Sequence, residues 1–126
     1  MSRELFYDAK HFGIVPMGFC YPGKGKSGDL PPRPECSEKW IQPVLNYIKD
    51  VQLKIIIGKY AMAYFLEAES AGVTEIVKQW KSFLPSMVVL PHPSPRNNIW
   101  LKKNAWFEKN LVPHLRRKVQ AIIGDI

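Results

Sequence analysis

The feature that most constrains this chain is a run of alternating prolines, Pro91, Pro93 and Pro95, directly after the apolar stretch Met87–Leu90. Proline has no backbone N–H and fixes its own φ, so this run can form neither a helix nor the centre of a sheet. The apolar stretch before it has the length of a buried strand. We therefore expect a stiff, extended loop at the carboxyl end of a strand, where open α/β sheets bind ligands, with His92 held inside it.

The charge of the chain indicates a polyanionic partner. The 126 residues carry a formal net charge of +7, and the sequence pI is about 9.5. A surplus of this size favours nucleic acid, although an ordinary basic surface is the alternative interpretation. Amides and an aromatic side chain lie among the basic residues, as suits contacts with phosphates and unstacked bases. The basic clusters and the residues between them are Lys24, Lys26, Arg33, Arg96, Asn97, Asn98, Trp100, Lys102, Lys103, Asn104, Arg116, Arg117 and Lys118.

Length and hydropathy predict one globular domain over residues 1–126. The hydrophobic content of 46% is enough for a packed core, and the length leaves no room for a second domain. No apolar run approaches the roughly 20 residues that a membrane span needs. The first residues also lack the apolar stretch of a signal peptide, so we expect a cytoplasmic protein without a membrane partner.

The apolar pattern predicts an α/β fold with a short parallel sheet. Strands are expected at 14–17, 53–57 and 87–90, because each is a short apolar run bounded by glycine or proline. The run at 53–57 is unbroken, which predicts a strand buried on both faces. Strands that alternate with helices imply a parallel sheet with right-handed crossovers, in a three-layer α/β/α arrangement. A sheet of about three strands is thin, and an open edge would favour self-association.

Helices are expected between and after these strands. One begins at about Ser37 as N-cap and presents an apolar face that includes Trp40 and Tyr47. Others cover 59–66 and 74–83, the second with Thr74 as its cap. Asn104 is the expected cap of the last helix, whose apolar stripe includes Leu111 and Leu115.

The residues around the proline run resemble a known family. His92-Pro93-Ser94-Pro95 resembles the second signature motif of the uracil-DNA glycosylase superfamily, and the flanking segments 18–23, 26–34 and 98–104 support the resemblance. It extends over nearly the whole chain, which is similar to the C-terminal two-thirds of a member. Members normally begin with a cysteine pair, a first strand and a Gly-Gln-Ala-Pro-Gly-like loop. We therefore expect four strands in the intact fold. A missing N-terminal segment is then one expected partner of this chain, because it would supply the first strand and the first motif.

The resemblance implies a chemistry for the loop. It assigns His92 as the catalytic donor to a carbonyl of a base flipped from DNA, which favours departure of the base as an anion. Ser94 and Pro95 match positions that press on the neighbouring phosphodiester, and Arg96–Asn98 match the wedge that fills the vacated space. The implied function is hydrolysis of the N-glycosidic bond of uracil or another damaged base.

One departure keeps a second function open. In many members the strand that corresponds to 14–17 ends in an asparagine that reads the uracil edge, whereas this chain has Pro16, Met17 and Gly18. The preferred base therefore stays open. The alternative to an enzyme is a nucleic-acid-binding module, or a fragment, of the same fold without catalytic competence.

Cys20 and Cys36 raise the question of a metal centre. Fifteen residues separate them, and a disulfide is not expected in the cytosol. Their spacing resembles that of the iron–sulfur branch of the superfamily, in which a second pair completes a four-iron cluster. Four thiolates are the usual requirement, and the chain has two cysteines. We expect no cofactor here, and a [4Fe-4S] cluster only in a version with the second pair.

Overall fold

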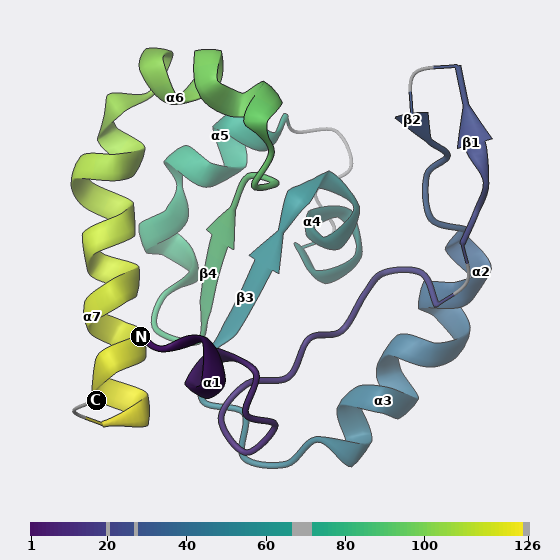
Figure 1. The fold of residues 1–126 in the computed structure, drawn as a ribbon, viewed down its shortest axis with the longest axis horizontal. Coiled ribbons are helices and arrows are strands. Elements are labelled where there is room, and N and C mark those ends of the chain that lie inside the picture. The colour runs from purple at the N-terminus through teal and green to yellow at the C-terminus, as the bar shows by residue number, and fades with distance from the viewer. Residues whose placement is uncertain (20, 27, 67–71, 125–126) are drawn as a thin grey trace.

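The computed structural model is centred on a pair of parallel strands, β3 (Lys54–Ile57) and β4 (Met87–Leu90), with Ile55 opposite Val88. In Figure 1, helix α4 (Gly58–Leu66) lies on one side of this pair, and α5 (Val73–Lys78) and α7 (Val112–Ile123) lie on the other. The predicted fold class, α/β with a short parallel sheet, is confirmed. The structure describes residues 1–19, 21–26, 28–66 and 72–124.

The hydrophobic core forms around β4. Val88 and Val89 are both buried, so this strand is covered on both faces, because neighbouring side chains of a strand point in opposite directions. The apolar stripes predicted for the flanking helices supply the rest of the core. Its buried members are Ile56, Ala61, Met62, Ile76, Val77, Trp80, Val88, Val89 and Leu111.

The prediction that β3 is buried on both faces was wrong. Ile56 points into the core and is 3% exposed, whereas Ile55 and Ile57 are 37% and 42% exposed. The unbroken run of isoleucines predicted two covered faces, but one face of β3 is partly open to solvent in the described part of the chain. A run of β-branched residues indicates a strand and does not by itself determine what packs on it.

The predicted strand at 14–17 was also wrong. Residues 14–17 have no strand geometry, and Ile14 is 71% exposed. A strand needs a neighbour for its backbone hydrogen bonds, and Pro16 removes one donor from this segment. The described strands pair only as β1 with β2 and β3 with β4, so 14–17 has no such neighbour among them. The parallel sheet has two strands in the described residues, where about three were predicted.

The first long helix starts earlier than predicted. Helical structure runs from α2 (Pro34–Cys36) through the π-helix η1 (Ser37–Ile41) into α3 (Gln42–Tyr47). Ser37 lies inside it and does not cap it: its hydroxyl donates to the carbonyl of Pro34 at 2.9 Å. The predicted apolar face is largely in solvent, with Tyr47 89% exposed.

Both π-helices precede a proline inside a helix. The segment η1 ends two residues before Pro43, and η4 (Phe107–Leu111) ends two residues before Pro113 at the start of α7. A proline lacks the N–H of the regular ladder, and its ring clashes with the carbonyl four residues earlier. A wider turn just before the proline relieves that clash without ending the helix.

The predicted helix 74–83 forms as two pieces, α5 and the 3₁₀ helix η2 (Trp80–Phe83), and its N-cap is Gly72 in place of Thr74. Asn104 is the C-cap of α6 (Asn98–Lys103), and its backbone carbonyl also accepts from Phe107 N–H at the start of the last helical segment. No helix in the described ranges is both long and apolar enough to cross a bilayer.

The amino-terminal part is an extended arm beside the sheet. It contains α1 (Arg3–Phe6) and an antiparallel hairpin of β1 (Lys24–Gly25) and β2 (Gly28–Asp29), followed by α2 to α3. In Figure 1 the hairpin, α2 and α3 lie to the right, away from β3 and β4. Ile41 is buried in this arm, outside the main core cluster.

Candidate active site

The proline loop after β4 is held by contacts within itself. Ser94 is the N-cap of the 3₁₀ helix η3 (Pro95–Asn97), and its hydroxyl oxygen accepts from the N–H of Arg96 at 3.2 Å. The side-chain amide of Asn97 donates to the backbone carbonyl of His92. Three prolines and these two bonds restrict the conformation of the loop, as the positioning of a catalytic group requires.

His92 lies at the carboxyl end of both strands. Its ring packs beside Gly58, which follows β3 directly: a Cβ at Gly58 would lie 3.8 Å from the Cβ of His92 and 3.9 Å from its Cδ2. Gly58 is buried and has a φ of +84°, a conformation that glycine adopts without strain. His92 itself is exposed, and among the described residues its one hydrogen bond is the one accepted by its backbone carbonyl. The imidazole therefore remains free to bind a ligand.

Helix α6 follows the loop and is anchored to α5. The indole N–H of Trp100 donates to the hydroxyl of Thr74 at 2.7 Å, and the Trp100 ring meets Phe107 edge-on at 5.4 Å. This anchor turns the exposed face of α6, with Lys102 and Lys103 in its last turn, to the solvent beside the loop.

A comparison with known protein families identifies the chain. The family model described as "Uracil DNA glycosylase superfamily" matches residues 2–116. The chain belongs to this superfamily. Membership in the uracil DNA glycosylase superfamily supports a glycosylase-like role in DNA repair, with DNA as the partner. It confirms the resemblance that the residues around His92 suggested.

The structure brings most of the predicted site residues of this superfamily member together. His92, Ser94 and Pro95 share the loop with Arg96, and Asn98 begins α6. Asn97 is half-buried, and its side-chain amide donates to the backbone carbonyl of His92 within the loop. Ile99 is 68% exposed beside these residues, and sequence reasoning had not singled it out.

Sequence reasoning also missed the two residues that support the loop. The sequence pattern indicates Gly58 only as the end of the strand 53–57, and Thr74 only as a helix cap. The signal for Gly58 was available, since a glycine directly after a parallel strand often permits close approach of another backbone or side chain. The bond between Thr74 and Trp100 joins residues 26 positions apart, and no local pattern indicates it.

The remaining predicted DNA-binding residues lie on the arm. Lys24 belongs to β1, Lys26 follows it in the same hairpin, and Arg33 is the N-cap of α2. In Figure 1, α4 separates this hairpin from the loop after β4. The structure therefore places these arm residues apart from the group at the His92 loop, and the third basic cluster, Arg116–Lys118, lies on α7.

The hairpin carries one shifted ionisable group. The hydroxyl of Tyr21 donates to the Oδ1 of Asp29 at 3.0 Å. Desolvation, and then this hydrogen bond, raise the pKa of Tyr21 above its ordinary value of 10.0. The phenol therefore remains neutral and bound to Asp29 at neutral pH.

The cysteine pair does not fit a four-iron cluster. Cys36 is a free, half-buried thiol at the end of α2, and Cys20 lies outside the described residues. The described residues contain no group of three or more His, Cys, Asp or Glu side chains that could hold a metal ion. Two cysteines in the whole sequence cannot supply four thiolates, so no step of the chemistry is assigned to such a cluster.

Proposed function

We propose that the loop after β4 is a base-excision site that hydrolyses the N-glycosidic bond of uracil, or of another damaged base, flipped from DNA. The observation that carries this proposal is the exposed imidazole of His92, fixed at the carboxyl end of β3 and β4 in a member of the uracil DNA glycosylase superfamily. Open α/β sheets place ligands at that edge, and a flipped base needs a donor there.

The proposed role of His92 is electrostatic. In hydrolysis the bond between the sugar C1′ and the base nitrogen breaks, and the base leaves with the electron pair. Water adds to C1′ and gives up a proton, which ends on the departed base. An N–H of His92 aimed at a base carbonyl stabilises the negative charge as it forms, and a fixed donor does so without reorganising. Gly58 and Asn97 provide that fixed position.

The neighbouring residues suit contact with the DNA backbone. The Ser94 oxygen accepts from Arg96 N–H, which leaves its own hydrogen free to donate to a phosphate. Arg96, Lys102 and Lys103 are exposed beside it. Ile99 adds an apolar side chain of the kind that enters the space left by an extruded base.

The second candidate is a DNA-binding module of the same fold without catalysis. Two observations favour it: residues 16–18 offer no side-chain amide to read a uracil edge, and 14–17 does not form the predicted strand. Both candidates bind DNA with an affinity that falls as salt increases, because phosphate contacts release counterions. Only the first releases a free base.

The test is uracil release from a labelled oligonucleotide that contains one deoxyuridine, offered single-stranded and as a duplex. We expect His92→Ala to lower the rate by a factor of about 10², the cost of one donor to a developing anion. His11→Ala is the matched control, since His11 is an exposed histidine on the arm, 3.1 Å from Asp8. Equal rates for His92→Ala and the unmodified protein would remove His92 from the mechanism. Salt-dependent binding without any base release would select the DNA-binding module.

A further inference from the structure

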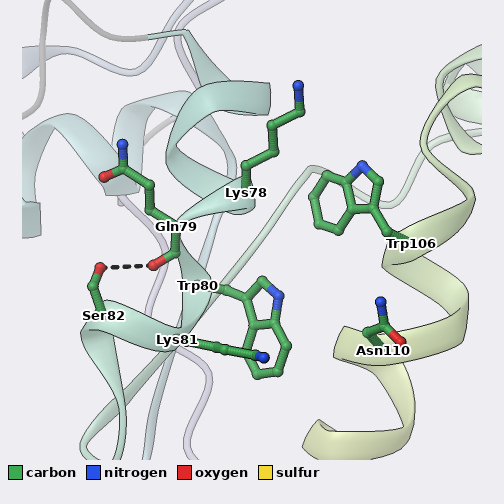
Figure 2. Close-up of a pocket in the computed structure, with 7 residues that line it drawn as sticks. All are labelled: Lys78, Gln79, Trp80, Lys81, Ser82, Trp106 and Asn110. Atoms are coloured by element: carbon green, nitrogen blue, oxygen red, sulfur yellow. Dashed lines mark hydrogen bonds between the residues drawn. The ribbon is translucent and has the colours of Figure 1, made fainter.

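One cavity of the described residues lies away from His92. It has a volume of about 590 Å³ and lies between the α5–η2 segment and the helix that begins before η4. Figure 2 shows Trp106 and Asn110 on that helix, facing Lys78 and Trp80 across the opening. A second cavity of about 280 Å³ continues it along α7 and shares Trp80, Lys81 and Asn110 with it. Together they form one groove, called the α5–α7 groove below.

The groove is basic. Its lining contains four cations, Lys78, Lys81, Lys109 and Arg117, and no carboxylate. The Nζ of Lys78 lies 3.9 Å from the Oε1 of Glu75. The salt bridges found between described residues do not involve Lys81, Lys109 or Arg117. Uncompensated cations that line one cavity attract an anionic ligand.

The groove is also aromatic. Trp80 forms its floor and is 7% exposed, with the His114 ring 5.2 Å away and the Lys81 ammonium 5.6 Å from the indole centroid. Trp106 is half-buried, and its N–H donates to the Oδ1 of Asn104 at 3.3 Å, which fixes the indole. A fixed indole beside cations offers a stacking surface for a base whose phosphates the lysines hold.

The groove is separate from the proposed excision site. Lys78–Ser82 precede β4, whereas His92 follows its carboxyl end, and a four-residue strand is about 13 Å long. No residue of the His92 loop lines either cavity. A ligand in the groove and a base beside His92 would therefore occupy different sites.

We propose that the α5–α7 groove binds single-stranded DNA, with phosphates on Lys81 and Lys109 and an unpaired base stacked on Trp106. Single-stranded DNA fits better than a duplex, because only unpaired bases expose the faces that stack on an indole. The amides of Gln79 and Asn110, which also line the groove, supply hydrogen bonds that tolerate any base. The inference rests on DNA as the partner of the proposed function, but not on catalysis at His92.

The experiment measures binding of a fluorescent oligothymidylate, which contains no uracil, by anisotropy over a range of salt. We expect the double variant Lys81→Gln, Lys109→Gln to bind roughly tenfold more weakly at low salt. The slope of log affinity against log salt should fall in magnitude by about 1.4, since each single-strand phosphate contact contributes about 0.7. Trp106→Phe should weaken binding roughly fivefold with an unchanged slope, because it reduces stacking and removes no charge.

The matched control is the double variant Lys39→Gln, Lys49→Gln, which removes the same charge from exposed lysines of the arm. We expect it to retain both the affinity and the slope to within twofold. An equal loss in control and groove variants would show attraction by net charge alone and overturn the proposal, as would an unchanged affinity in the groove variants. A duplex that bound as tightly, with the same losses, would overturn the single-strand assignment.

The oligothymidylate experiment and the uracil-release experiment can fail independently of each other. If uracil release fails while oligothymidylate binding still depends on Lys81, Lys109 and Trp106, the groove inference stands alone. If the groove variants bind normally while His92→Ala loses uracil release, only the groove inference is overturned.

Discussion

Residues 53–123 of this protein form a packed α/β unit, whereas residues 1–50 form an arm that buries little. Every buried member of the core cluster lies between Ile56 and Leu111, and the arm contributes Ile41 alone to the buried apolar residues described. Both regions are rich in apolar residues and both carry basic clusters. What differs is pairing: β3 and β4 satisfy each other's backbone groups, and 14–17 has no neighbouring strand among the described residues.

The comparison also separates two kinds of site. In the packed unit, His92 is supported by the buried Gly58 and by Asn97, which is bonded to the His92 carbonyl. On the arm, Lys24 and Lys26 are exposed on a hairpin of two two-residue strands. Positioned chemistry is therefore expected from the first region, and salt-sensitive attraction from both.

The largest expected effect tests where stability resides. Leu111→Ala removes a fully buried side chain from the core and should lower the free energy of unfolding by about 2–5 kcal/mol. Trp40→Ala on the arm removes a larger side chain that is 48% exposed, and should lower the free energy of unfolding by less, on the order of 0.5 kcal/mol. Urea unfolding followed by circular dichroism measures both. Similar losses for the two variants would show that the arm packs as firmly as the sheet region.

The next effect tests the support of His92. Gly58→Ala should cost about 1–2 kcal/mol, because a side chain at a φ of +84° clashes with its own backbone. The added methyl itself has room, since the nearest atom of His92 is 3.8 Å away. Gly72→Ala is the control: Gly72 is the N-cap of α5 with a negative φ and no atom within 4 Å, so its cost should be only a few tenths of a kcal/mol. Equal stability for Gly58→Ala and the unmodified protein would contradict the strained position.

An effect of similar size is expected at the anchor of α6. Thr74→Val removes the oxygen that accepts from the Trp100 N–H and leaves that donor half-buried without its partner. The expected loss is about 1–2 kcal/mol of unfolding free energy, and Thr74→Ser, which keeps the hydroxyl, should retain most of it. Thermal unfolding measures both, and amide exchange over α6 shows whether the helix loosens locally. Equal behaviour of the valine and serine variants would mean that the bond does not hold α6.

Local chemistry explains which parts of the structure could be predicted from the sequence. The loop at 91–98 was predictable because proline restricts the backbone whatever surrounds it, and the strand 87–90 because its apolar run is short and bounded. The helix 59–66 and the buried residues Ile76, Val77 and Trp80 followed from helical spacing.

The helix ends at Ser37 and Thr74 were local errors, but the larger errors concern contacts between distant segments. An apolar run at 14–17 resembles a strand, but only a neighbouring strand makes it one. The exposure of Ile55 and Ile57 depends on what packs on β3, and the pairing of Thr74 with Trp100 depends on how α5 and α6 meet. The α5–α7 groove joins residues about 30 positions apart, so neither half of it is recognisable in the sequence alone.

The smallest expected effect is a pH dependence confined to the hairpin of the arm. The pKa of Tyr21 is raised by desolvation and by its bond to Asp29, so folding favours the neutral phenol. The stabilisation is therefore complete below the ordinary tyrosine pKa of 10.0 and is lost as the pH rises through the higher value of the folded state. An ultraviolet absorbance titration of the unmodified protein minus that of Tyr21→Phe isolates this phenol. Asp29→Asn keeps an acceptor but removes the negative charge, and should shift the midpoint back toward 10.0. A titration midpoint of the Tyr21 phenol at or below 10.0 in the unmodified protein would contradict this prediction. It would mean that the hydrogen bond between Tyr21 and Asp29 does not form in solution, and that this bond does not hold the hairpin of the arm.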